Sequence, residues 1–545
     1  MHLLAFPLSL LVVLWLWNVQ RCDAAQVPLA QQSSTSRSPL DDEFEKAVNW
    51  TLEHFRTPGL SIAVVRGNDT FTKGYGVSDL STLQPVTEHT HFVVGSTTKA
   101  FTAAAISLLV DDNDHFPQIQ WHTPVHNIIP DDFVLYDDWS TTHVTIEDAL
   151  SHRSGLPRHD YAWHFYNVSI VEVVRKMRHL PLTAPIRTRW QYCNLMYVAM
   201  AHLIETVTGQ YLGDFFRERI WGPLGMNETF MSVPEAQAAG VDVARGYEVN
   251  RTGGYEETGY HIWPQARGAG NVVSSAVDYA KWIRAMIDRA PPISAAGHAA
   301  LVRAHSIVTP DIVPPESAPV TYGLGWDIHS YRGEVLIEHT GAQPGFGTGV
   351  FYLPNRQFGV ALFGNNMIGG GAAVQVLAYH LIDEFLGTPK EERFDWVSLG
   401  DKLVPNTTVT PDMLRRLYPS VPDPPLPPAA DVSAYPGVYV HPAYPTLNIT
   451  ADCPPSAYLP PFPHRAGPSG TVKICIQSLF NYKERHVEFI HVSGDFWVLG
   501  TELWGQTLIR RAEFRLGPDG RVRQLGVELE PAMAGEKIWY DRVAA

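Results

Sequence analysis

Hydrophobic and polar positions alternate with two different periods along this chain. In the first folded stretch, apolar residues lie three or four positions apart: Phe44, Val48, Leu52 and Phe55. This spacing predicts an amphipathic helix that begins at Asp41 and ends at Pro58 and Gly59. Residues 60–65 and 70–75 then form two runs that predict strands, joined by a turn at 66–69. The tip of that turn carries an Asn-x-Thr sequence and must therefore face water.

The middle of the chain, from about 97 to 286, has mostly helical spacing. Three helix starts there carry a capping box: Thr145 with Asp148, Ser169 with Glu172, and Ser275 with Asp278. Strand alternation returns in four runs: 325–330, 334–340, 347–352 and 358–363, with a hairpin turn at Pro354 and Asn355. An amphipathic helix at 373–386 ends at Gly387. Strands at both ends of the domain predict the α+β class, with an antiparallel sheet flanked by helices and an inserted helical lobe.

Proline marks the end of this mixed section. Six of the ten residues at 419–428 are proline and predict a stiff spacer. Short alternating runs beyond it predict a small β-sandwich or barrel: 437–440, 447–450, 472–477 and 513–516. We therefore expect five segments: a leader at 1–24, a flexible arm at 25–40, the mixed domain at 41–400, a Pro-rich linker at 401–430 and the β domain at 431–545.

Composition and charge narrow the classes of function. The chain has 545 residues, of which 45% are apolar, and this is more than one core uses. Its 15 Trp, 22 Tyr and 23 Phe argue against long disordered regions. A net charge of -15 would repel a polyanion, so we expect no nucleic-acid partner.

The amino-terminal sequence indicates a secretory route. Residues 3–17 form an apolar run that would span about 22 Å as a helix, less than the roughly 30 Å of bilayer hydrocarbon. We interpret it as a signal peptide cleaved after Ala24, with a retained anchor as the alternative. After cleavage we expect a secreted protein without membrane contact. Seven Asn-x-Ser/Thr sites favour the same glycosylating route: Asn49, Asn68, Asn167, Asn227, Asn250, Asn406 and Asn448.

Three cysteines remain beyond the leader. Cys453 and Cys475 flank a Pro-rich loop, and we expect a disulfide that closes about 23 residues and contributes roughly 3 kcal/mol in the chain-entropy model. Cys193 would then be a free, buried thiol. The sequence has no Cys-x-x-Cys and no His-Glu-x-x-His, so we expect no metal ion and no cofactor.

The first candidate catalytic motif opens an apolar helix. Ser96 and Lys99 lie one turn apart on the same face of this helix. A serine hydroxyl needs a neighbouring base to become nucleophilic, and a lysine can be that base only when burial or nearby positive charge lowers its pKa. The apolar residues that follow predict such burial. On this motif alone, a capping serine beside a solvated lysine is the favoured interpretation.

A second motif, Tyr192-Cys193-Asn194, precedes a helix at 195–207. A tyrosine near positive charge can become a phenolate base. The amide of Asn194 can hold a substrate amide while it also bonds the lysine. Taken alone, the motif also fits a core tyrosine followed by an asparagine cap.

A third motif ends an alternating strand with three residues: His339, Thr340 and Gly341. Small residues at a strand edge let a substrate backbone pair alongside. The N–H of Ala342 can join that of Ser96 as a two-donor oxyanion hole. A rival triplet at 251–253 lies beside an Asn-x-Thr site without strand alternation, and we interpret it as an exposed hairpin.

In this order, the three motifs make residues 41–387 resemble the serine β-lactamase and penicillin-binding-protein family, in particular its secreted esterases, D-aminopeptidases and class C-like enzymes. Further segments carry the resemblance: PGLSIAVVRGN (58–68), KGYGVSDL (73–80), TIEDALSHRSGLP (145–157), WGPLGMNETFMS (221–232), GAGNVVSSAVDYAKWI (268–283) and YGLGWDI (322–328). The segment SAYPGVYVHPAYPTLNIT (433–450) makes residues 431–545 similar to the lipocalin-like β domain often appended to this family.

The resemblance implies acyl transfer. Ser96 would attack a carbonyl, Lys99 and Tyr192 would move protons, and two backbone N–H groups would hold the oxyanion. The substrate-binding residues that it implies are Asn194, His339, Thr340 and Gly341. The lactamase pattern has lysine where this chain has His339. Histidine is nearly neutral at pH 7, whereas lysine is a permanent cation, so recognition of a β-lactam or peptide carboxylate is in doubt.

Three hypotheses for the function follow from these motifs. The first is a secreted serine hydrolase that cleaves an ester or amide bond of a small molecule or of a short peptide, including one with D-residues. The second is an acyltransferase that uses the same chemistry to acylate an alcohol or amine. The third is an inactive relative that binds a ligand. An α/β-hydrolase is excluded because no Gly-x-Ser-x-Gly occurs.

Overall fold

The fold is described from a computed structural model of the chain. The residues described are 37–164, 168–250, 252–403, 411–422, 424–453, 473–476, 487–503 and 506–543. The predicted leader, nearly all of the predicted arm, Asn167 and Asn406 lie outside these residues.

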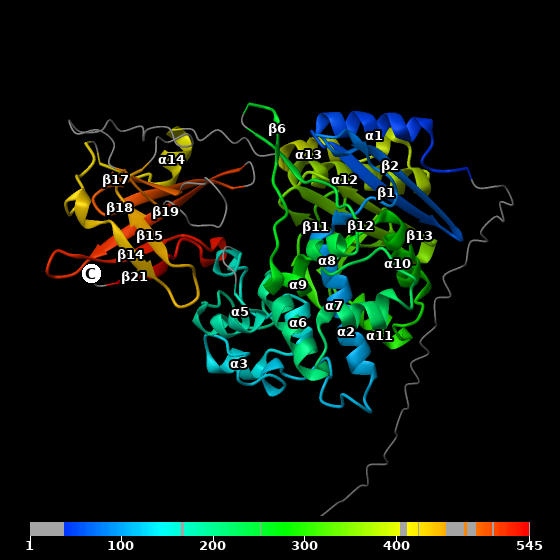
Figure 1. Ribbon diagram of the computed structural model, residues 1–545, viewed down its shortest axis with the longest axis horizontal. Coiled ribbons are helices and arrows are strands. Elements are labelled where there is room, and N and C mark those ends of the chain that lie inside the picture. The colour runs from blue at the N-terminus through cyan, green and yellow to red at the C-terminus, as the bar shows by residue number, and fades with distance from the viewer. Residues whose placement is uncertain are drawn as a thin grey trace, which may run out of the picture. The chain divides into compact units, whose positions relative to one another are not determined.

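A nine-stranded antiparallel sheet forms the centre of the mixed domain (Figure 1), in the order β3-β2-β1-β13-β12-β11-β10-β9-β8. Its strands are β1 (Gly59–Arg66), β2 (Asp69–Asp79), β3 (Gln84–Pro85), β8 (Ser306–Thr309), β9 (Val320–Tyr322), β10 (Asp327–Tyr331), β11 (Glu334–Gln343), β12 (Phe346–Leu353) and β13 (Phe358–Gly364). Strand β1 pairs with β13, so the two ends of the domain meet in the middle of the sheet. This confirms the predicted α+β architecture.

Both faces of the sheet are covered, so alternation along a strand sorts residues between two cores. In β1, Leu60, Ile62 and Val64 pack with α1 (Asp42–His54) and α12 (Ile368–Leu386). Ala63 and Val65 pack on the opposite face with α10 (Ala276–Asp288) and the helical lobe. Figure 1 shows α1 and α12 on one side of the sheet and α10 on the other.

The helical lobe lies between β4 (Phe92–Val93) and β8 in the sequence. Its helices are α2 (Thr98–Asp111), α3 (Asp138–His143), α4 (Ile146–Leu150), α5 (Ile170–Lys176), α6 (Asn194–Thr208), α7 (Leu212–Phe216), α8 (Val233–Ala238) and α9 (Arg267–Gly270), followed by α10 and α11 (Ala295–Leu301). The capping boxes at the starts of α4 and α5 are confirmed.

The third predicted capping box is only half formed. Ser275 accepts a hydrogen bond from the backbone N–H of Asp278, as expected. The Asp278 carboxylate, however, accepts from the Glu228 N–H at 2.6 Å and from the Thr229 hydroxyl at 2.8 Å. The acidic residue therefore anchors the preceding loop rather than the start of its own helix.

The predicted β domain is a closed eight-stranded barrel. Its strands are β14 (Gly437–Val440), β15 (Leu447–Thr450), β16 (Lys473–Ile476), β17 (Val487–Ser493), β18 (Phe496–Leu503), β19 (Gln506–Leu516), β20 (Val522–Val527) and β21 (Ile538–Arg542). Aromatic rings fill its interior, where Tyr435 and Phe514 pack against Trp497 with centroids 5.1 and 5.6 Å away. The disulfide Cys453–Cys475 is present, and Cys193 is a buried free thiol.

The stretch expected to be a linker has structure of its own. Helices α13 (Trp396–Leu403) and α14 (Pro411–Leu417) lie within or beside it. In the proline-rich part, the N–H of Leu426 donates to the Ser493 hydroxyl, and its carbonyl accepts from the Gly494 N–H. This part of the spacer is therefore attached to the barrel.

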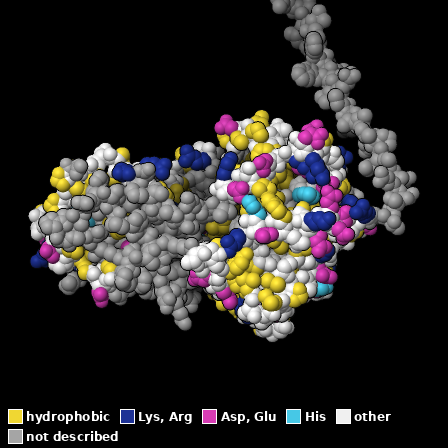
Figure 2. All heavy atoms as spheres, turned by 90° about the horizontal axis from the view of Figure 1, so that it is seen from above, with side chains coloured by type: hydrophobic (Ala, Val, Ile, Leu, Met, Phe, Trp, Pro, Cys, Tyr) yellow, Lys and Arg dark blue, Asp and Glu magenta, His cyan; other side chains and the backbone are white. Residues whose placement is uncertain are grey.

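The surface carries mixed charge, and on the face in Figure 2 Lys and Arg side chains stand among Asp and Glu side chains. Four predicted glycosylation sites are exposed: Asn49, Asn68, Asn227 and Asn448. Asn250 is half-buried, because its amide oxygen accepts hydrogen bonds inside its own loop. Within the described ranges, every helix is too short or too polar to span a bilayer.

Candidate active site

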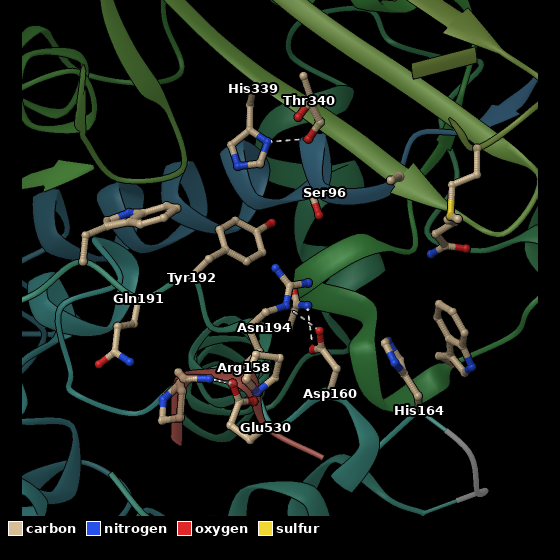
Figure 3. Close-up of a pocket in the computed structure, with 18 of the residues that line it drawn as sticks. Ser96, Arg158, Asp160, His164, Gln191, Tyr192, Asn194, His339, Thr340 and Glu530 are labelled. Atoms are coloured by element: carbon tan, nitrogen blue, oxygen red, sulfur yellow. Dashed lines mark hydrogen bonds and ion pairs between the residues drawn. The ribbon is translucent and has the colours of Figure 1, made fainter. Parts of the chain in front are cut away.

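A cavity of about 730 Å³ contains most of the side chains that the sequence singled out. Its walls include Ser96 at the start of α2, residues from the loops at 157–164 and 190–194, the end of β11, and the barrel turn at 530–532. Figure 3 shows Ser96 with His339 and Thr340 on one side and with Arg158, Asn194 and Asp160 on the other.

Lys99 is fully buried directly beneath Ser96. Its Nζ lies 3.1 Å from Ser96 Oγ, 2.7 Å from Asn194 Oδ1 and 2.8 Å from the carbonyl oxygen of Ala269. Burial and, after it, the positive charge of Arg158 hold the pKa of Lys99 well below its usual range. The structure therefore rules out the solvated lysine that the motif alone allowed.

Tyr192 lies over this pair, with its ring centre 4.8 Å from Lys99 Nζ. Burial raises the pKa of Tyr192 above its usual value, although a hydrogen bond with Ser96 and the nearby Arg158 charge oppose that effect. Tyr192 is therefore a neutral phenol at neutral pH rather than the phenolate that nearby positive charge can produce. Positive charge is present in Arg158, but the effect of burial on the pKa outweighs it.

His339 is buried on the opposite side of Ser96, and its ring is neutral. Its Nδ1 lies 2.6 Å from the Thr340 carbonyl oxygen, and its Nε2 lies 3.1 Å from the hydroxyl of Tyr322. A carbonyl oxygen can only accept, so Nδ1 carries the proton and Nε2 accepts from Tyr322. Burial and the charge of Lys99 lower the pKa of His339 to about 3. This agrees with the expectation that the position lacks a positive charge at pH 7.

The end of β11 offers a free edge beside the serine. Its pairing with β10 stops at Glu338, and among the described strands residues 339–343 pair with β12 alone. Gly95 has φ +56°, and a methyl group on it would lie 2.7 Å from the Ala342 backbone nitrogen. Glycine at this position therefore lets the backbones of Ser96 and Ala342 meet at the cavity.

Four acidic or basic residues of the cavity were missed by the sequence interpretation: Asp327, Glu530, Arg158 and Asp160. Arg158 Nε donates to Asp160 Oδ2 at 2.6 Å, and the guanidinium lies 4.9 Å from the ring centre of Tyr192. Asp160 Oδ1 accepts from Asn194 Nδ2 at 3.0 Å. Burial opposes ionisation of Asp160, but the Arg158 charge outweighs it and lowers the pKa of this carboxyl. The signal for Arg158 and Asp160 was their position directly after the segment TIEDALSHRSGLP.

The segment at 145–157 also holds the Tyr192-Cys193-Asn194 motif in place. The N–H of Cys193 donates to Nδ1 of the buried His152 at 3.0 Å. The loop is held in turn by Asp148, which is fully buried and pairs with Arg153 at 2.6 Å and with Arg187 at 2.7 Å. Residues 145–160 therefore support Tyr192 and Asn194 from one side.

Thr252 and Gly253 of the rival triplet lie between strands β5 (Tyr247–Val249) and β6 (Tyr255–Glu257), which pair as a hairpin, as the sequence predicted. Arg251 lies outside the described residues. In the part of the chain that the structure describes, no three His, Cys, Asp or Glu side chains are grouped as they would be around a metal ion.

The fold and the grouping of Ser96, Lys99 and Tyr192 in one cavity define the class: a β-lactamase and penicillin-binding-protein fold carrying a C-terminal barrel. The chain belongs to the β-lactamase family, because the sequence model described as Beta-lactamase matches residues 44–382.

Two relatives match this chain over nearly its whole length. The chain is 40% identical over 521 residues to the unguisins hydrolase of Aspergillus campestris, covering 94% of each protein. It is 36% identical over 533 residues to the unguisins hydrolase of Aspergillus violaceofuscus, covering 93% of this chain and 91% of that protein. A D-aminopeptidase of Cereibacter sphaeroides is 23% identical over 356 residues, which is 62% of each protein.

Solved structures share the fold at lower sequence identity. An octameric penicillin-binding protein homologue from Pyrococcus abyssi has a TM-score of 0.56 and 21% identity, with coverage of 92% of this chain and 99% of that one. A class C β-lactamase from Rhodobacter sphaeroides has a TM-score of 0.52 and 20% identity, with coverage of 64% of this chain and all of that one.

Proposed function

We propose that this protein is a serine hydrolase that works through an acyl-enzyme on Ser96. The observation that carries the proposal is the fully buried Lys99 amine, which lies 3.1 Å from Oγ of Ser96, a residue that lines the cavity. The geometry provides what an activated serine requires, namely a base within hydrogen-bond reach whose pKa is lowered by its surroundings.

The three partners of Lys99 suit a neutral amine. A neutral amine has two N–H groups, which donate to Asn194 Oδ1 and the Ala269 carbonyl, and one lone pair left for the hydroxyl of Ser96. When Ser96 Oγ bonds to a substrate carbonyl carbon, its proton passes to this lone pair. The ammonium that forms is then held by three oxygen acceptors.

The leaving group departs when the tetrahedral intermediate collapses. The bond from the carbonyl carbon to the leaving atom breaks, and that atom takes the proton held by Lys99 through the hydroxyl of Tyr192. A neutral phenol can do this because it gives one proton as it receives another, which fits the raised pKa of Tyr192. Water then attacks the acyl-enzyme along the same route and restores Ser96.

The oxyanion is stabilised by backbone donors. Ser96 and Ala342 both line the cavity, and we propose that their N–H groups bind the carbonyl oxygen of the substrate. Preorganised N–H donors in a site with little water stabilise developing negative charge strongly. The free edge of residues 339–343 provides backbone groups for an extended substrate.

The substrate that we propose has an ester or amide bond, in a small molecule or a short peptide that includes D-residues. The names of the relatives, unguisins hydrolase and D-aminopeptidase, support an amide or peptide substrate. The neutral ring of His339 argues against a substrate that is anchored by a carboxylate at that position. We assign substrate contacts to Asn194, His339, Thr340 and Gly341.

We further propose that the mature protein is secreted and consists of the hydrolase domain and the barrel joined by the Pro-rich linker. The disulfide Cys453–Cys475 supports folding in an oxidising compartment. The exposed Asn-x-Ser/Thr sites are accessible to glycosylation.

A panel of p-nitrophenyl esters, D- and L-residue p-nitroanilides and nitrocefin tests the proposed activity on the full secreted chain. We expect turnover of esters or D-residue amides with little turnover of nitrocefin, and loss of turnover in Ser96→Ala. Turnover by Ser96→Ala equal to that of the wild type would refute the assignment.

A further inference from the structure

His159 is the point at which the barrel holds the cavity loop. The residue is fully buried and has φ 43° and ψ 38°, a left-handed conformation that costs a side-chain-bearing residue about 1 kcal/mol or more. Two barrel residues contact it. Glu530 Oε2 accepts from the His159 N–H at 2.7 Å, and the Tyr444 hydroxyl lies 2.7 Å from His159 Nδ1.

The protonation of these groups follows from their partners. His159 Nε2 lies 2.9 Å from the carbonyl oxygen of Pro181, so Nε2 carries the proton and Nδ1 accepts from the Tyr444 hydroxyl. Burial lowers the pKa of His159, which keeps the ring neutral. The second oxygen of Glu530 accepts from the Ala532 N–H at 3.0 Å. Both oxygens of Glu530 are therefore engaged with backbone donors.

The left-handed turn separates His159 from its two neighbours. His159 is held by barrel residues, whereas Arg158 and Asp160 line the cavity on either side of it. Figure 3 shows Arg158 and Asp160 beside Asn194, with Glu530 below them in this view. The conformation of one residue therefore decides whether this ion pair points at the site.

A chain of hydrogen bonds leads from this pair to the proposed nucleophile. Asp160 accepts from Asn194 Nδ2, and Asn194 Oδ1 accepts from Lys99 Nζ, which lies 3.1 Å from Ser96 Oγ. Asp160 thereby fixes the rotamer of Asn194, because the amide must present its NH₂ to the carboxylate and its oxygen to the lysine. Few other arrangements satisfy both ends of a buried amide.

We propose that Glu530 and Tyr444 of the barrel are positioning residues for the hydrolase site, which act through His159 to set Arg158 and Asp160 and, through them, the Asn194–Lys99 pair. The inference rests on the proposed function of Ser96 and Lys99. It assigns the barrel a part in the reactivity of the serine, beyond any contact with substrate.

The expected effect is on the reactivity of Ser96 and on its pH dependence. A loosened 157–160 loop admits water beside Lys99, which weakens the burial that lowers the pKa of this amine. The groups that act on Lys99 or lie against it are Arg158, Asp160, Tyr192, Cys193, Tyr197, His152 and His339. With Arg158 and Asp160 displaced, less of the amine is neutral at pH 7, and the acid limb of the rate profile moves to higher pH.

The test is the second-order rate constant for labelling of Ser96 by a small alkyl fluorophosphonate between pH 5 and 9. We expect Glu530→Ala to lower it about tenfold at pH 7, since small misplacements in a site cost up to about 100-fold. Tyr444 does not line the cavity, and Tyr444→Phe should lower the labelling rate constant about threefold. The acid limb should move to higher pH in both.

Two comparisons separate positioning from general damage. Glu513→Gln removes an ion pair with Lys537 inside the barrel and should leave the profile unchanged. In an Asp160→Asn background, Glu530→Ala should have little further effect, because both act on the same chain of bonds. Thermal unfolding of each variant checks that the fold persists, and Glu530→Gln is the milder replacement if Glu530→Ala unfolds.

The outcomes distinguish the inference from the proposed function. If wild-type Ser96 is labelled and Glu530→Ala and Tyr444→Phe match the wild type across the pH range, the positioning role is wrong and the proposed function stands. Fully additive losses in the double variant would also overturn it. If wild-type Ser96 is not labelled at all, both proposals fall.

Discussion

Replacing Lys99 by methionine removes the amine on which the proposed chemistry depends and keeps the volume of the side chain. The buried Nζ contacts Ser96, Asn194 and the carbonyl of Ala269, and methionine replaces none of these contacts. The variant therefore separates the reactivity of the serine from the packing of α2, in which Lys99 is surrounded by apolar residues.

The magnitude follows from the contacts. Loss of a general base lowers turnover by roughly 10² to 10⁴, or about 3 to 6 kcal/mol at about 1.4 kcal/mol for each factor of ten. Two buried oxygens lose their donor, at about 1 to 3 kcal/mol each. Burying an amine costs free energy in the wild type, and the variant does not have this cost. The gain offsets the loss of the two hydrogen bonds, so we expect the free energy of unfolding at pH 7 to change by no more than about 2 kcal/mol.

The difference in the free energy of unfolding between the wild type and Lys99→Met depends on pH, and the direction of this dependence follows from the pKa shift of Lys99. The pKa of Lys99 in the folded state lies below 10.5, its value in the unfolded state. At a pH between these two pKa values, the unfolded state therefore binds one proton more than the folded state. The wild type therefore gains stability relative to Lys99→Met as the pH rises through that window.

Initial rates with p-nitrophenyl acetate from pH 5 to 9, together with thermal unfolding of the same samples, measure both quantities. Lys390→Met is the control, because Lys390 is exposed and pairs only with the exposed Glu43 among the described residues. A folded Lys99→Met variant that keeps a third or more of the wild-type kcat/KM would show that another group activates the serine.

Three further results are expected. Gly95→Ala should lower kcat/KM about 100-fold, since its methyl group would meet the Ala342 nitrogen, and unchanged kinetics would remove the proposed oxyanion hole. Asp148→Asn should lower the free energy of unfolding by about 3 kcal/mol, because it breaks a buried network of ion pairs. Urea denaturation measures this change, with Asp519→Asn at an exposed ion pair as the control. His339→Lys should raise kcat/KM for a p-nitrophenyl hemisuccinate relative to the acetate, and an unchanged ratio would show that charge there does not select substrates.

The fold could be predicted from the sequence wherever a strand or helix has a clear pattern of apolar residues. Strands β1 and β13 are buried on both sides, so their runs of apolar residues stood out, and α12 was marked by its apolar stripe and by Gly387. The short strands β3, β8 and β9 gave no such signal, because half-exposed segments of two to four residues lack a period.

The site was predicted only where its residues lie close together in the sequence. Ser96 and Lys99 lie one helical turn apart, and local spacing was enough to bring them together. Arg158 and Asp160 had no recognisable spacing, since their direction depends on the left-handed turn at His159. Glu530 lies 371 residues from His159, and nothing local marks that contact.

The protonation state of Tyr192 shows a different limit. The sequence allowed a phenolate if positive charge lay near the ring, and the Arg158 guanidinium does lie 4.9 Å from the ring centre. The sequence does not show how the ring is packed, and burial decides the direction of the pKa shift.

The central claim is that the hydroxyl of Ser96 becomes the acyl carrier. Intact-mass measurement of the full chain after a fluorophosphonate or slow ester substrate, followed by peptide mapping, tests it directly. A single adduct on the peptide that contains Ser96, absent from Ser96→Ala and slowed in Lys99→Met, is the predicted result. An adduct on another residue, or equal labelling of Ser96→Ala, would contradict it.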